Sequence, residues 1–242
     1  MKLRADQLLV ERGLFESRAR AQAAIAAGLV TADGAIVRKP SDRLAREARI
    51  EAEAPHPFVS RGGLKLAAAL DAFGFDPQGR DCLDIGASTG GFTDVLLRRG
   101  ARHVLAVDVG REQLHASLRR HPRVTSLEGQ DIRELAPAAT QAPPSLAVID
   151  VSFISLKLVL PAVAALLAPE AGLVALVKPQ FEAGRAALKK GVVRDAETHE
   201  RVCGEIVAAL QELGFAVLGL VPSPIEGGDG NREFLVGARR PA

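Results

Sequence analysis

The chain has 242 residues, of which 48% are hydrophobic and 25% are charged, an ordinary composition for a globular protein. The longest apolar stretches, such as residues 158–167, are interrupted or too short to span a bilayer, which excludes an integral membrane protein. Cys82 and Cys203 are the only cysteines, and the five histidines show no zinc-ligand spacing with them. We therefore expect neither a disulfide framework nor a metal site.

Residues 1–54 carry the cap and turn signals of a small α+β domain. Ser17 is a good helix N-cap, and Gly28 supplies a left-handed stop. Asp33-Gly34 interrupts an alternating apolar pattern, which is a strong signal for a tight hairpin. The predicted elements are a helix that Gly13 closes, a helix over residues 18–27 and a hairpin over residues 30–37.

The net charge of +2 arises entirely within residues 1–60, which hold ten basic and eight acidic residues. An excess this small is ordinary for a solvated surface, and it indicates nucleic-acid binding only if the basic side chains share one side. The first residues, MKLRADQLLVERG, contain no apolar core of signal-peptide length, so we expect a cytoplasmic protein.

Pro55 and Pro57 favour an extended backbone and mark residues 55–60 as a linker. From Arg61 to residue 242, short apolar strands alternate with helices, which predicts a Rossmann-like, doubly wound parallel sheet. The last two strands are joined by a loop without a helix, which predicts an antiparallel hairpin at the sheet edge. The predicted strands are residues 81–85, 103–107, 124–127, 146–149, 173–177, 216–221 and 233–236, and the predicted helices are 92–99, 113–120, 156–167 and 196–213.

The first of these strands ends in a glycine-rich turn, which lets the backbone approach a ligand. Its spacing, Gly86-x-x-x-Gly90-Gly91, differs from the G-x-G-x-x-G of dinucleotide sites, and the chain has no G-x-x-x-x-G-K-[ST]. Asp84 would repel a pyrophosphate but suits the cationic methionine part of S-adenosylmethionine. An NAD-dependent oxidoreductase is therefore the lesser alternative. The residues expected to hold S-adenosylmethionine here are Asp84, Gly86, Ala87, Ser88, Thr89, Gly90, Gly91 and Phe92.

The ends of the next two strands add candidate cofactor ligands. Asp108, followed by Val109, can accept hydrogen bonds from the ribose hydroxyls of an adenosine ligand, whether S-adenosylmethionine or NAD. Gln130 and Asp131 can frame the adenine, although Asp131 is equally suited to cap the residues that follow it. We also assign Asp150, at the end of the fourth strand, to the cofactor site.

The ends of the fourth and fifth strands bear on the methyl acceptor. The fourth strand lacks the polar residue, two prolines and aromatic residue typical of enzymes that methylate base amines, and neither cysteine lies where carbon-5 methylation of a pyrimidine needs one. These ends carry Asp150 and Lys178 instead. The chain has seven Lys and twenty-four Arg, and a buried Lys, unlike Arg, can lose its proton. We interpret Lys178 as the group that removes a proton from a ribose 2′-hydroxyl, with a purely structural Lys178–Asp150 pair as the alternative.

At this point the sequence resembles a known family. The segments SRGGLKL, CLDIGASTGGFTDVLLRRGA, VDVG, DVSFISL, VKPQFE, KKGVV and NREFLV follow one another in family order across nearly the whole length. The catalytic part resembles the FtsJ/RrmJ-type ribose methyltransferases, and the chain as a whole is similar to the TlyA (hemolysin A) family of ribosomal RNA 2′-O-methyltransferases. The front segment resembles the RNA-binding domain first recognised in ribosomal protein S-four. The resemblance implies a catalytic tetrad of Lys65, Asp150, Lys178 and Glu233, and each position holds the expected residue type.

The resemblance also implies ribosomal RNA or ribosomal subunits as partners. It assigns RNA contacts to Arg4, Arg18, Lys39, Arg61 and Arg133, for each of which a surface salt bridge is the alternative. The chain contains no Trp or Tyr, so Phe153 is the best placed side chain to stack on a splayed base. The sequence stops soon after Arg240, as in the shorter family members that are associated with large-subunit RNA, so we expect a cytidine there as the target.

Two other classes of function compete with this interpretation. A non-catalytic RNA-binding or ribosome-assembly protein would bind RNA without transferring a methyl group. A membrane-lysing protein would need an amphipathic helix without a core, whereas the predicted helices alternate with strands that would bury them. The residues leave open the nucleotide, the oligomeric state and the exact role of Lys178: Lys65 and desolvation would favour a neutral lysine, and the two carboxylates of the tetrad would favour a charged one.

Overall fold

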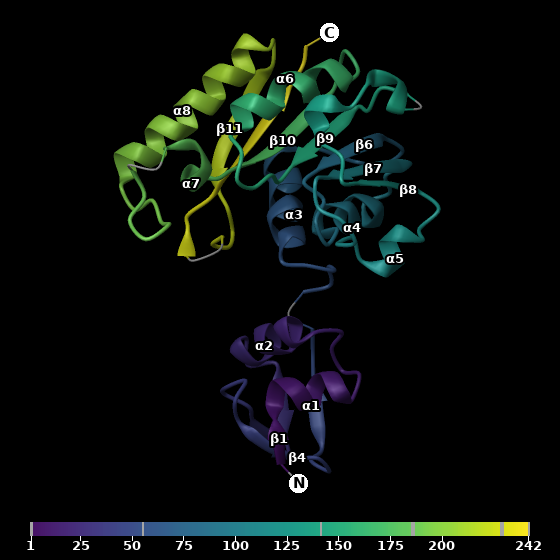
Figure 1. The fold of residues 1–242 in the computed structure, drawn as a ribbon, viewed down its shortest axis with the longest axis vertical. Coiled ribbons are helices and arrows are strands. Elements are labelled where there is room, and N and C mark those ends of the chain that lie inside the picture. Colours follow the sequence, from purple (N-terminus) through teal and green to yellow (C-terminus); the bar gives the residue numbers. More distant parts are fainter. Residues whose placement is uncertain (1, 55, 141, 185–186, 228–229, 242) are drawn as a thin grey trace. The chain divides into compact units, whose positions relative to one another are not determined.

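The computed structural model describes residues 2–54, 56–140, 142–184, 187–227 and 230–241. The chain divides into two compact units, Met1–Pro57 and Phe58–Ala242 (Figure 1). Phe58 and Val59 pack against the core of the second unit, and the Val59 N–H donates to Asp94 Oδ2 at 3.0 Å.

The first unit packs two helices against short strands. A two-stranded antiparallel ladder pairs β1 with β4, and a three-stranded sheet has the order β3-β2-β5. Ser17 caps α2 by accepting from the Arg20 N–H, and Asp33 and Gly34 both adopt positive φ in the turn between β2 and β3, as predicted from the Asp-Gly pair. The elements are β1 (Lys2–Arg4), α1 (Ala5–Glu11), α2 (Arg18–Ala26), β2 (Val30–Ala32), β3 (Ala35–Ile36), β4 (Arg43–Ala45) and β5 (Ile50–Ala52).

The second unit is a seven-stranded sheet in the order β11-β12-β10-β9-β6-β7-β8, with β12 antiparallel to both of its neighbours and the other neighbouring pairs parallel. The predicted Rossmann-like sheet with an antiparallel edge hairpin, β11–β12, is therefore confirmed. Its strands are β6 (Asp81–Ile85), β7 (His103–Asp108), β8 (Val124–Glu128), β9 (Leu146–Ile149), β10 (Gly172–Val177), β11 (Ala216–Pro222) and β12 (Phe234–Arg239).

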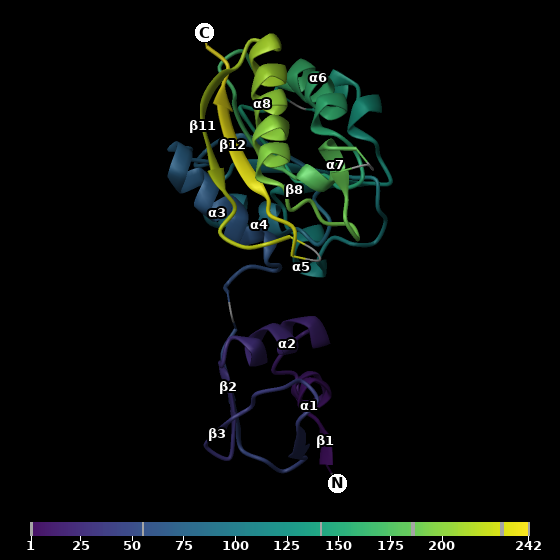
Figure 2. The ribbon, with the colours of Figure 1, turned by 90° about the vertical axis from the view of Figure 1, so that its left-hand side faces the viewer.

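Helices cover both faces of this sheet (Figures 1 and 2). Successive residues of the parallel strands alternate between two cores, as the pleat requires: Cys82 packs with α3 and α4, whereas Leu83 packs with α6 and α8. The helices are α3 (Gly62–Phe73), α4 (Gly91–Arg98), α5 (Ala116–Arg119), α6 (Leu156–Leu166), α7 (Pro179–Glu182) and α8 (Ala196–Glu212), with 3₁₀ turns η1 (Ile132–Glu134) and η2 (Pro137–Ala139).

Three helices of the second unit differ from the predictions, one of them the short α7, which was not predicted. The predicted helix over residues 113–120 is reduced to α5, because the Glu128 carboxylate accepts from the N–H groups of Gln113 and Leu114 and holds that segment in a loop. The helix α3 was not predicted, since its N-cap position is Arg61, which makes no side-chain cap. It lies before the first strand of the sheet and carries Lys65 into the core.

The strand order reverses between β6 and β9. From β6 the chain proceeds to β7 and β8 on one side, and then crosses to β9 on the other side of β6. In open α/β sheets, ligands bind outside the carboxyl ends of the strands at such a switch point. Gly86 follows β6 and Asp150 follows β9, so the predicted site residues stand at this position.

Candidate active site

Gly86 closes the turn at the switch point against the neighbouring strand. Its φ is +79°, and a Cβ atom added there would lie 2.3 Å from the Asp150 carbonyl oxygen. No larger residue fits without moving one strand end, because the clash is with backbone. The glycine therefore brings the ends of β6 and β9 close together, with three cavities around them.

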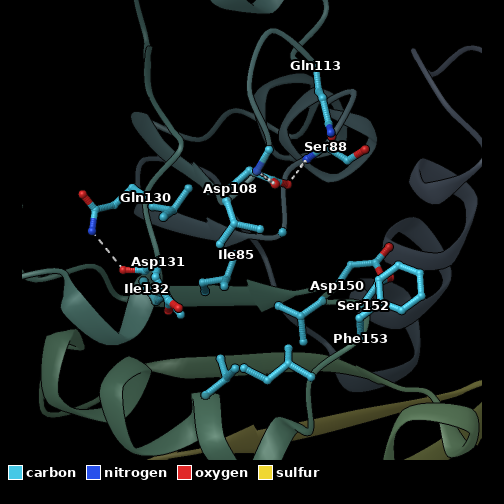
Figure 3. A pocket seen from close by; sticks show the side chains of 17 residues that line it. Ile85, Ser88, Asp108, Gln113, Gln130, Asp131, Ile132, Asp150, Ser152 and Phe153 are labelled. Carbon is cyan, nitrogen blue, oxygen red and sulfur yellow. Dashed lines mark hydrogen bonds between the residues drawn. The ribbon is translucent and has the colours of Figure 1, made fainter.

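The first cavity, which we call the strand-end cavity, has a volume of about 360 Å³. It opens at the carboxyl ends of β6, β7, β8 and β9 (Figure 3). Seven of the predicted cofactor residues line it: Gly86, Ser88, Asp108, Val109, Gln130, Asp131 and Asp150.

Asp108 is held rigidly at the mouth of the strand-end cavity. Its Oδ2 accepts from the Ser88 N–H and its Oδ1 accepts from the Gly110 N–H, each at 2.7 Å (Figure 3). Each carboxylate oxygen has a second lone pair, so each can still accept a hydrogen bond from a hydroxyl group. This geometry suits a pair of neighbouring hydroxyl groups.

Asp131 lines the cavity and also caps the 3₁₀ turn that follows it. It caps η1 by accepting from the Arg133 N–H, and it pairs with the Arg133 guanidinium, whose hydrogen bond lowers the pKa of Asp131. Gln130 donates through Nε2 to the Asp131 carbonyl at 3.0 Å. The capping role that the sequence left open is thus present, and Arg133 is engaged in a surface ion pair.

Asp84 lies behind the cavity rather than in its wall. It is fully buried, accepts from Thr93 Oγ1 at 2.6 Å and lines none of the three cavities. Among the described residues, its Oδ1 has no hydrogen-bond partner. Burial raises the pKa of Asp84 to about 7, against the hydrogen bond from Thr93, which lowers it. Gly90 also lies outside the cavities, with φ at +96° and the Leu118 side chain where a Cβ would stand.

The second cavity, which we call the helix-end cavity, has a volume of about 230 Å³ and lies at the amino-terminal ends of α3 and α4. Neither helix has a side-chain cap at this end, and the positive ends of two helix dipoles face the cavity. In the first turn of α3, the N–H groups of Gly63 and Leu64 donate to the carbonyls of Ser60 and Arg61. Its lining residues are Ser60, Arg61, Gly62, Lys65, Gly86, Ala87, Ser88, Thr89, Gly91, Phe92, Asp150 and Ile225.

The third cavity, which we call the aromatic cavity, has a volume of about 760 Å³ and contains Lys178 and Glu233 in its wall. Phe153 is 90% exposed at its rim and adopts a φ of +64°, an unusual cost for a bulky residue. Its ring lies 4.9 Å from that of Phe181, centroid to centroid. The rim therefore presents an aromatic surface to solvent.

The four residues of the expected tetrad form two ion pairs where the three cavities meet. Lys65 Nζ donates to Glu233 Oε2 at 2.5 Å, and Lys178 Nζ lies 2.6 Å from Asp150 Oδ1. Lys65 and Asp150 line the helix-end cavity, whereas Lys178 and Glu233 line the aromatic cavity. The two pairs thus form the wall between them.

Some residues of the site were not predicted from the sequence. Ser152 accepts from Lys178 Nζ at 2.8 Å and lines both the strand-end and the aromatic cavities. Its position two residues after Asp150 was the available signal. Asn231 lines the aromatic cavity and joins two loops, since it donates to the Gly191 carbonyl and accepts from the Val193 N–H. No sequence spacing indicates that contact.

The predicted RNA-binding residues have different surroundings. Arg61 is exposed at the helix-end cavity. In the first unit Lys39 is exposed, and Arg4 and Arg18 both contact Asp6. Among the described residues, no helix is both long and apolar enough to cross a membrane.

Comparison with known proteins defines the class. Residues 58–240 match the model of the FtsJ-like methyltransferases, and residues 3–50 match the S4 domain. The chain is a methyltransferase of the FtsJ-like class preceded by an S4 domain.

Its relatives narrow this class further. The chain is 47% identical to YqxC of Bacillus subtilis, a candidate rRNA methyltransferase, over 97% of this chain and 85% of that one. It is 44% identical to the 16S/23S rRNA (cytidine-2′-O)-methyltransferase TlyA of Mycobacterium tuberculosis, over 98% of this chain and 90% of that one. A solved structure from Streptococcus thermophilus, described as a candidate hemolysin, has 46% identity and a TM-score of 0.79, covering 99% of this chain and 88% of that chain. The protein belongs to the TlyA family.

Proposed function

We propose that this protein transfers a methyl group from S-adenosylmethionine to the 2′-hydroxyl of a cytidine ribose in ribosomal RNA, with large-subunit RNA as the first substrate to test. The observation that carries the proposal is the pair of lysine–carboxylate contacts, Lys178–Asp150 and Lys65–Glu233, at the meeting point of the three cavities. A TlyA relative that shares 44% of its residues is named for this reaction. Such a protein would work in the cytoplasm, where ribosomes are.

The strand-end cavity fits the adenosine part of the cofactor. Asp108 offers both carboxylate oxygens to the ribose hydroxyls, and Gln130 and Asp131 flank the space for the adenine. Val109 adds an apolar wall. The close approach at Gly86 leaves room for the sulfur and its methyl group beside Asp150.

The helix-end cavity fits the methionine part. A carboxylate would accept hydrogen bonds from N–H groups in the first turn of α4, and the dipoles of α3 and α4 both favour a negative charge there. A Cβ at Gly91 would lie 2.2 Å from Ser60 Oγ and 3.0 Å from the Gly63 backbone nitrogen, so a larger residue would crowd this wall. Asp84 would act from behind this wall, through the field of its buried carboxyl group rather than by contact.

The aromatic cavity fits the acceptor nucleotide. Phe153, backed by Phe181, would stack on a base that has left its helix, which is the usual way in which proteins recognise single-stranded RNA. The ribose would then lie against Lys178 and Glu233. Both cysteines are buried and burial raises the pKa of Cys82 to about 12, which argues against a thiolate nucleophile for carbon methylation.

We assign proton acceptance to Lys178. Asp150 and Ser152 hold its amino group, and it faces the cavity that would contain the hydroxyl. S-adenosylmethionine supplies an electrophilic methyl group on a sulfur that leaves as a neutral thioether, so no residue has to act as an acid. Most of the acceleration would come from aligning the hydroxyl oxygen with the methyl group.

We further propose that the first unit recognises RNA and that the second carries out the transfer. Arg4, Arg18 and Lys39 would contact phosphates, while Arg61, beside the helix-end cavity, and Arg133 would contact the RNA near the reacting nucleotide. The predicted division into residues 1–54, a linker over 55–60 and residues 61–242 assigns these roles to separate parts of the chain.

One experiment tests the proposal directly. Ribosomal RNA from a strain with the gene and from its deletion strain is mapped for 2′-O-methylation, and the purified protein is then given the unmethylated subunits and labelled S-adenosylmethionine. We expect one cytidine in large-subunit RNA to lose its methyl group on deletion and regain it in vitro. Identical maps from the two strains, with no transfer in vitro, would contradict the proposal.

A further inference from the structure

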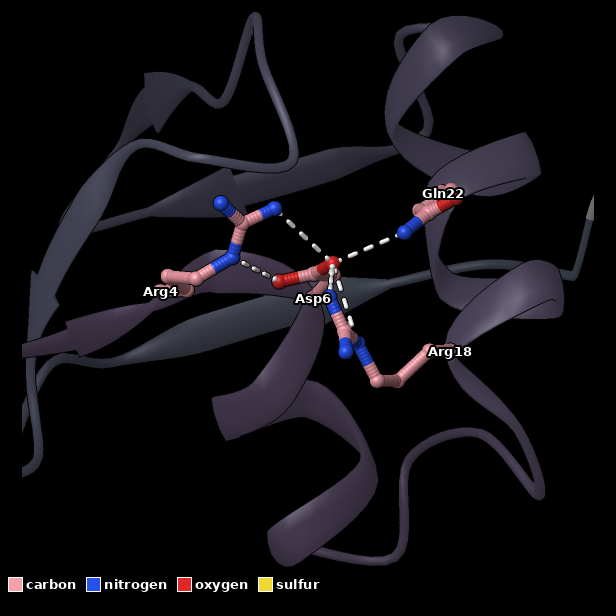
Figure 4. Close-up of polar contacts among 4 residues, drawn as sticks. All are labelled: Arg4, Asp6, Arg18 and Gln22. Carbon is pink, nitrogen blue, oxygen red and sulfur yellow. Dashed lines mark hydrogen bonds and ion pairs between the residues drawn. The ribbon is translucent and has the colours of Figure 1, made fainter.

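One buried carboxylate in the first unit has more partners than its charge requires. Asp6, in the first turn of α1, is fully buried and is surrounded by Arg4, Arg18 and Gln22 (Figure 4). Arg4 donates through Nε to Oδ1 at 3.0 Å and through Nη2 to Oδ2 at 3.2 Å. Arg18 donates to Oδ2 through Nε at 3.2 Å and Nη2 at 2.8 Å, and Gln22 adds a bond of 2.8 Å to the same oxygen.

A single arginine would neutralise this carboxylate. The second leaves the cluster with a net charge of +1, and both arginine side chains are partly exposed, 35% for Arg4 and 51% for Arg18. Each guanidinium carries more N–H donors than the two that it directs at Asp6, so each can also bind a phosphate oxygen. The cluster therefore presents two immobilised arginines and a surplus positive charge.

Backbone hydrogen bonds connect the same turn to the segment that carries a third basic residue, Lys39. The Ala5 N–H donates to the Asp42 carbonyl at 2.8 Å, and the Asp6 N–H donates to the Pro40 carbonyl at 3.2 Å. The Asp42 side chain accepts in turn from the N–H of Lys39 at 3.0 Å. Arg4, Arg18 and Lys39, which lie far apart in the sequence, are thus all attached to the Ala5–Asp6 turn.

We propose that Asp6 is a positioning residue for RNA binding: it fixes Arg4 and Arg18 in a phosphate-binding arrangement before RNA arrives. Long side chains that are mobile in the free protein lose rotamer entropy when they bind a ligand. Here Asp6 already immobilises Arg4 and Arg18 when the unit folds, so RNA binding does not have to order them. The inference rests on the proposed RNA-binding role of the first unit. It makes a prediction opposite in sign to simple electrostatics, because removing an acidic group from an RNA-binding surface ordinarily strengthens binding.

The test compares Asp6→Asn with Glu51→Gln in the full-length protein. Each change removes one negative charge from the first unit, but Glu51 pairs only with Arg49 among the contacts recorded, and both side chains are well exposed. Binding to transcribed large-subunit ribosomal RNA is measured by filter retention at several salt concentrations, well below the melting temperature of each variant. We expect Asp6→Asn to bind about tenfold more weakly, as when two side chains must be immobilised during binding, and Glu51→Gln to bind equally well or more tightly.

A second pair of variants keeps every charge, so that no charge at Asp6 loses its counter-charge. Arg18→Lys should weaken RNA binding, since an ammonium cannot replace a fork that contacts Asp6 and a phosphate together. Arg20→Lys, on the same helix, should have no such effect. In single-turnover methylation, Asp6→Asn should raise the RNA concentration needed for half-maximal rate and leave the rate at saturating RNA unchanged.

The outcomes separate this inference from the function on which it rests. If Arg18→Ala weakens RNA binding but Asp6→Asn strengthens it or leaves it unchanged, Asp6 does not position the arginines and the inference is wrong. If Arg18→Ala itself has no effect, the proposed RNA contact of the first unit fails as well. Equal affinity of wild type and Arg18→Lys would also overturn the inference, because charge alone would then suffice.

Discussion

Lys178 is the residue whose chemistry is most open to a direct test. Its amino group lies between Asp150 and Ser152, a site shaped for an ammonium or amine rather than for a planar fork. Lys178→Arg keeps the charge but cannot accept a proton, so we expect single-turnover methyl transfer to fall by at least about a hundredfold, the usual contribution of a general base. Binding of S-adenosylmethionine and RNA should persist.

The matched control is Lys157→Arg, at a lysine whose recorded partner is Glu205 on the surface. It should retain the wild-type rate across the pH range. If Lys178→Arg also retains a near wild-type rate at saturating cofactor and RNA, a positive charge alone suffices at that position. The role of Lys178 as a base would then have to be abandoned.

Asp84 makes stability depend on pH. Burial raises its pKa to about 7, whereas an aspartate in an unfolded chain titrates near about 3.9. Between these values the folded state keeps a proton that the unfolded state has lost. The contribution to the free energy of unfolding is therefore full below the lower value, falls by up to about 1.4 kcal/mol per pH unit as the pH rises, and is lost above about pH 7.

Asp84→Asn removes this slope. Relative to wild type, the ligand-free variant should gain stability between about pH 5 and pH 7, by on the order of 2 kcal/mol, with no further gain above that. Chemical denaturation at fixed pH values measures it. The control is Asp81→Asn on the same strand, because a hydrogen bond from Arg102 lowers the pKa of Asp81 and its contribution is constant over this window. Parallel pH profiles for wild type and Asp84→Asn would mean that Asp84 is ionised in the folded protein.

At the scale of elements, the contact between β6 and β9 depends on a glycine. Gly86→Ala would place a Cβ against the Asp150 carbonyl in addition to straining a positive φ. Gly79→Ala is the matched control, since Gly79 has a φ of +70° but nothing within 4 Å of its Cβ position. We expect Gly79→Ala to cost about 1–2 kcal/mol through φ alone and Gly86→Ala clearly more.

The two variants are compared by thermal unfolding and by calorimetric binding of S-adenosylhomocysteine. Gly86→Ala should lower both the melting temperature and the affinity, because the strand ends that form the cavity have to separate. Gly79→Ala should lower only the melting temperature. Equal losses of stability and intact ligand binding in both variants would show that the close approach at Gly86 does not shape the cavity.

The elements also mark where the sequence was informative. Asp108, Asp150 and Lys178 were found because strands that alternate with helices place their carboxyl ends at one edge, and the structure places all three residues there. The assignment of Lys65 and Glu233 to the site followed only from the family resemblance, and their pairing was not predicted. No local pattern could reveal it, since α3 has no capping signal and its partner lies 168 residues away.

Other features needed the three-dimensional structure. Asp84 occupies the strand position expected of a cofactor ligand, yet it is buried behind the wall, because the Thr93 hydroxyl of α4 covers it. No sequence pattern singles out Asp6. Only the folded unit shows that strand β1, helix α2 and the loop at Pro40 all meet at that residue.

At the scale of the whole molecule, the two units predict a division of labour. A protein that starts at Phe58 keeps the packing of Phe58 and the Val59–Asp94 hydrogen bond, so its sheet should fold and bind S-adenosylmethionine as tightly as the full chain. It should lose RNA affinity and show a weaker dependence of that affinity on salt, because phosphate contacts release counterions.

The measurement is RNA binding by the full chain and by the shortened chain over a range of salt concentrations, with cofactor affinity as the control for folding. Full methylation activity in the shortened chain at low RNA concentration would show that the first unit is not a recognition module. Loss of cofactor binding would mean that the second unit depends on the first.

The two ion pairs of the tetrad, of which Lys65–Glu233 is buried, also restrict how this protein can change during evolution. Replacing Lys65 alone leaves Glu233 charged and 4% exposed, at a cost on the order of 3–5 kcal/mol for an uncompensated buried charge. Loss of Glu233 alone leaves Lys65 buried without its counter-charge. A lineage can therefore leave this state only through two coordinated substitutions, so among diverged relatives that no longer methylate, positions 65 and 233 should vary together, as should positions 150 and 178.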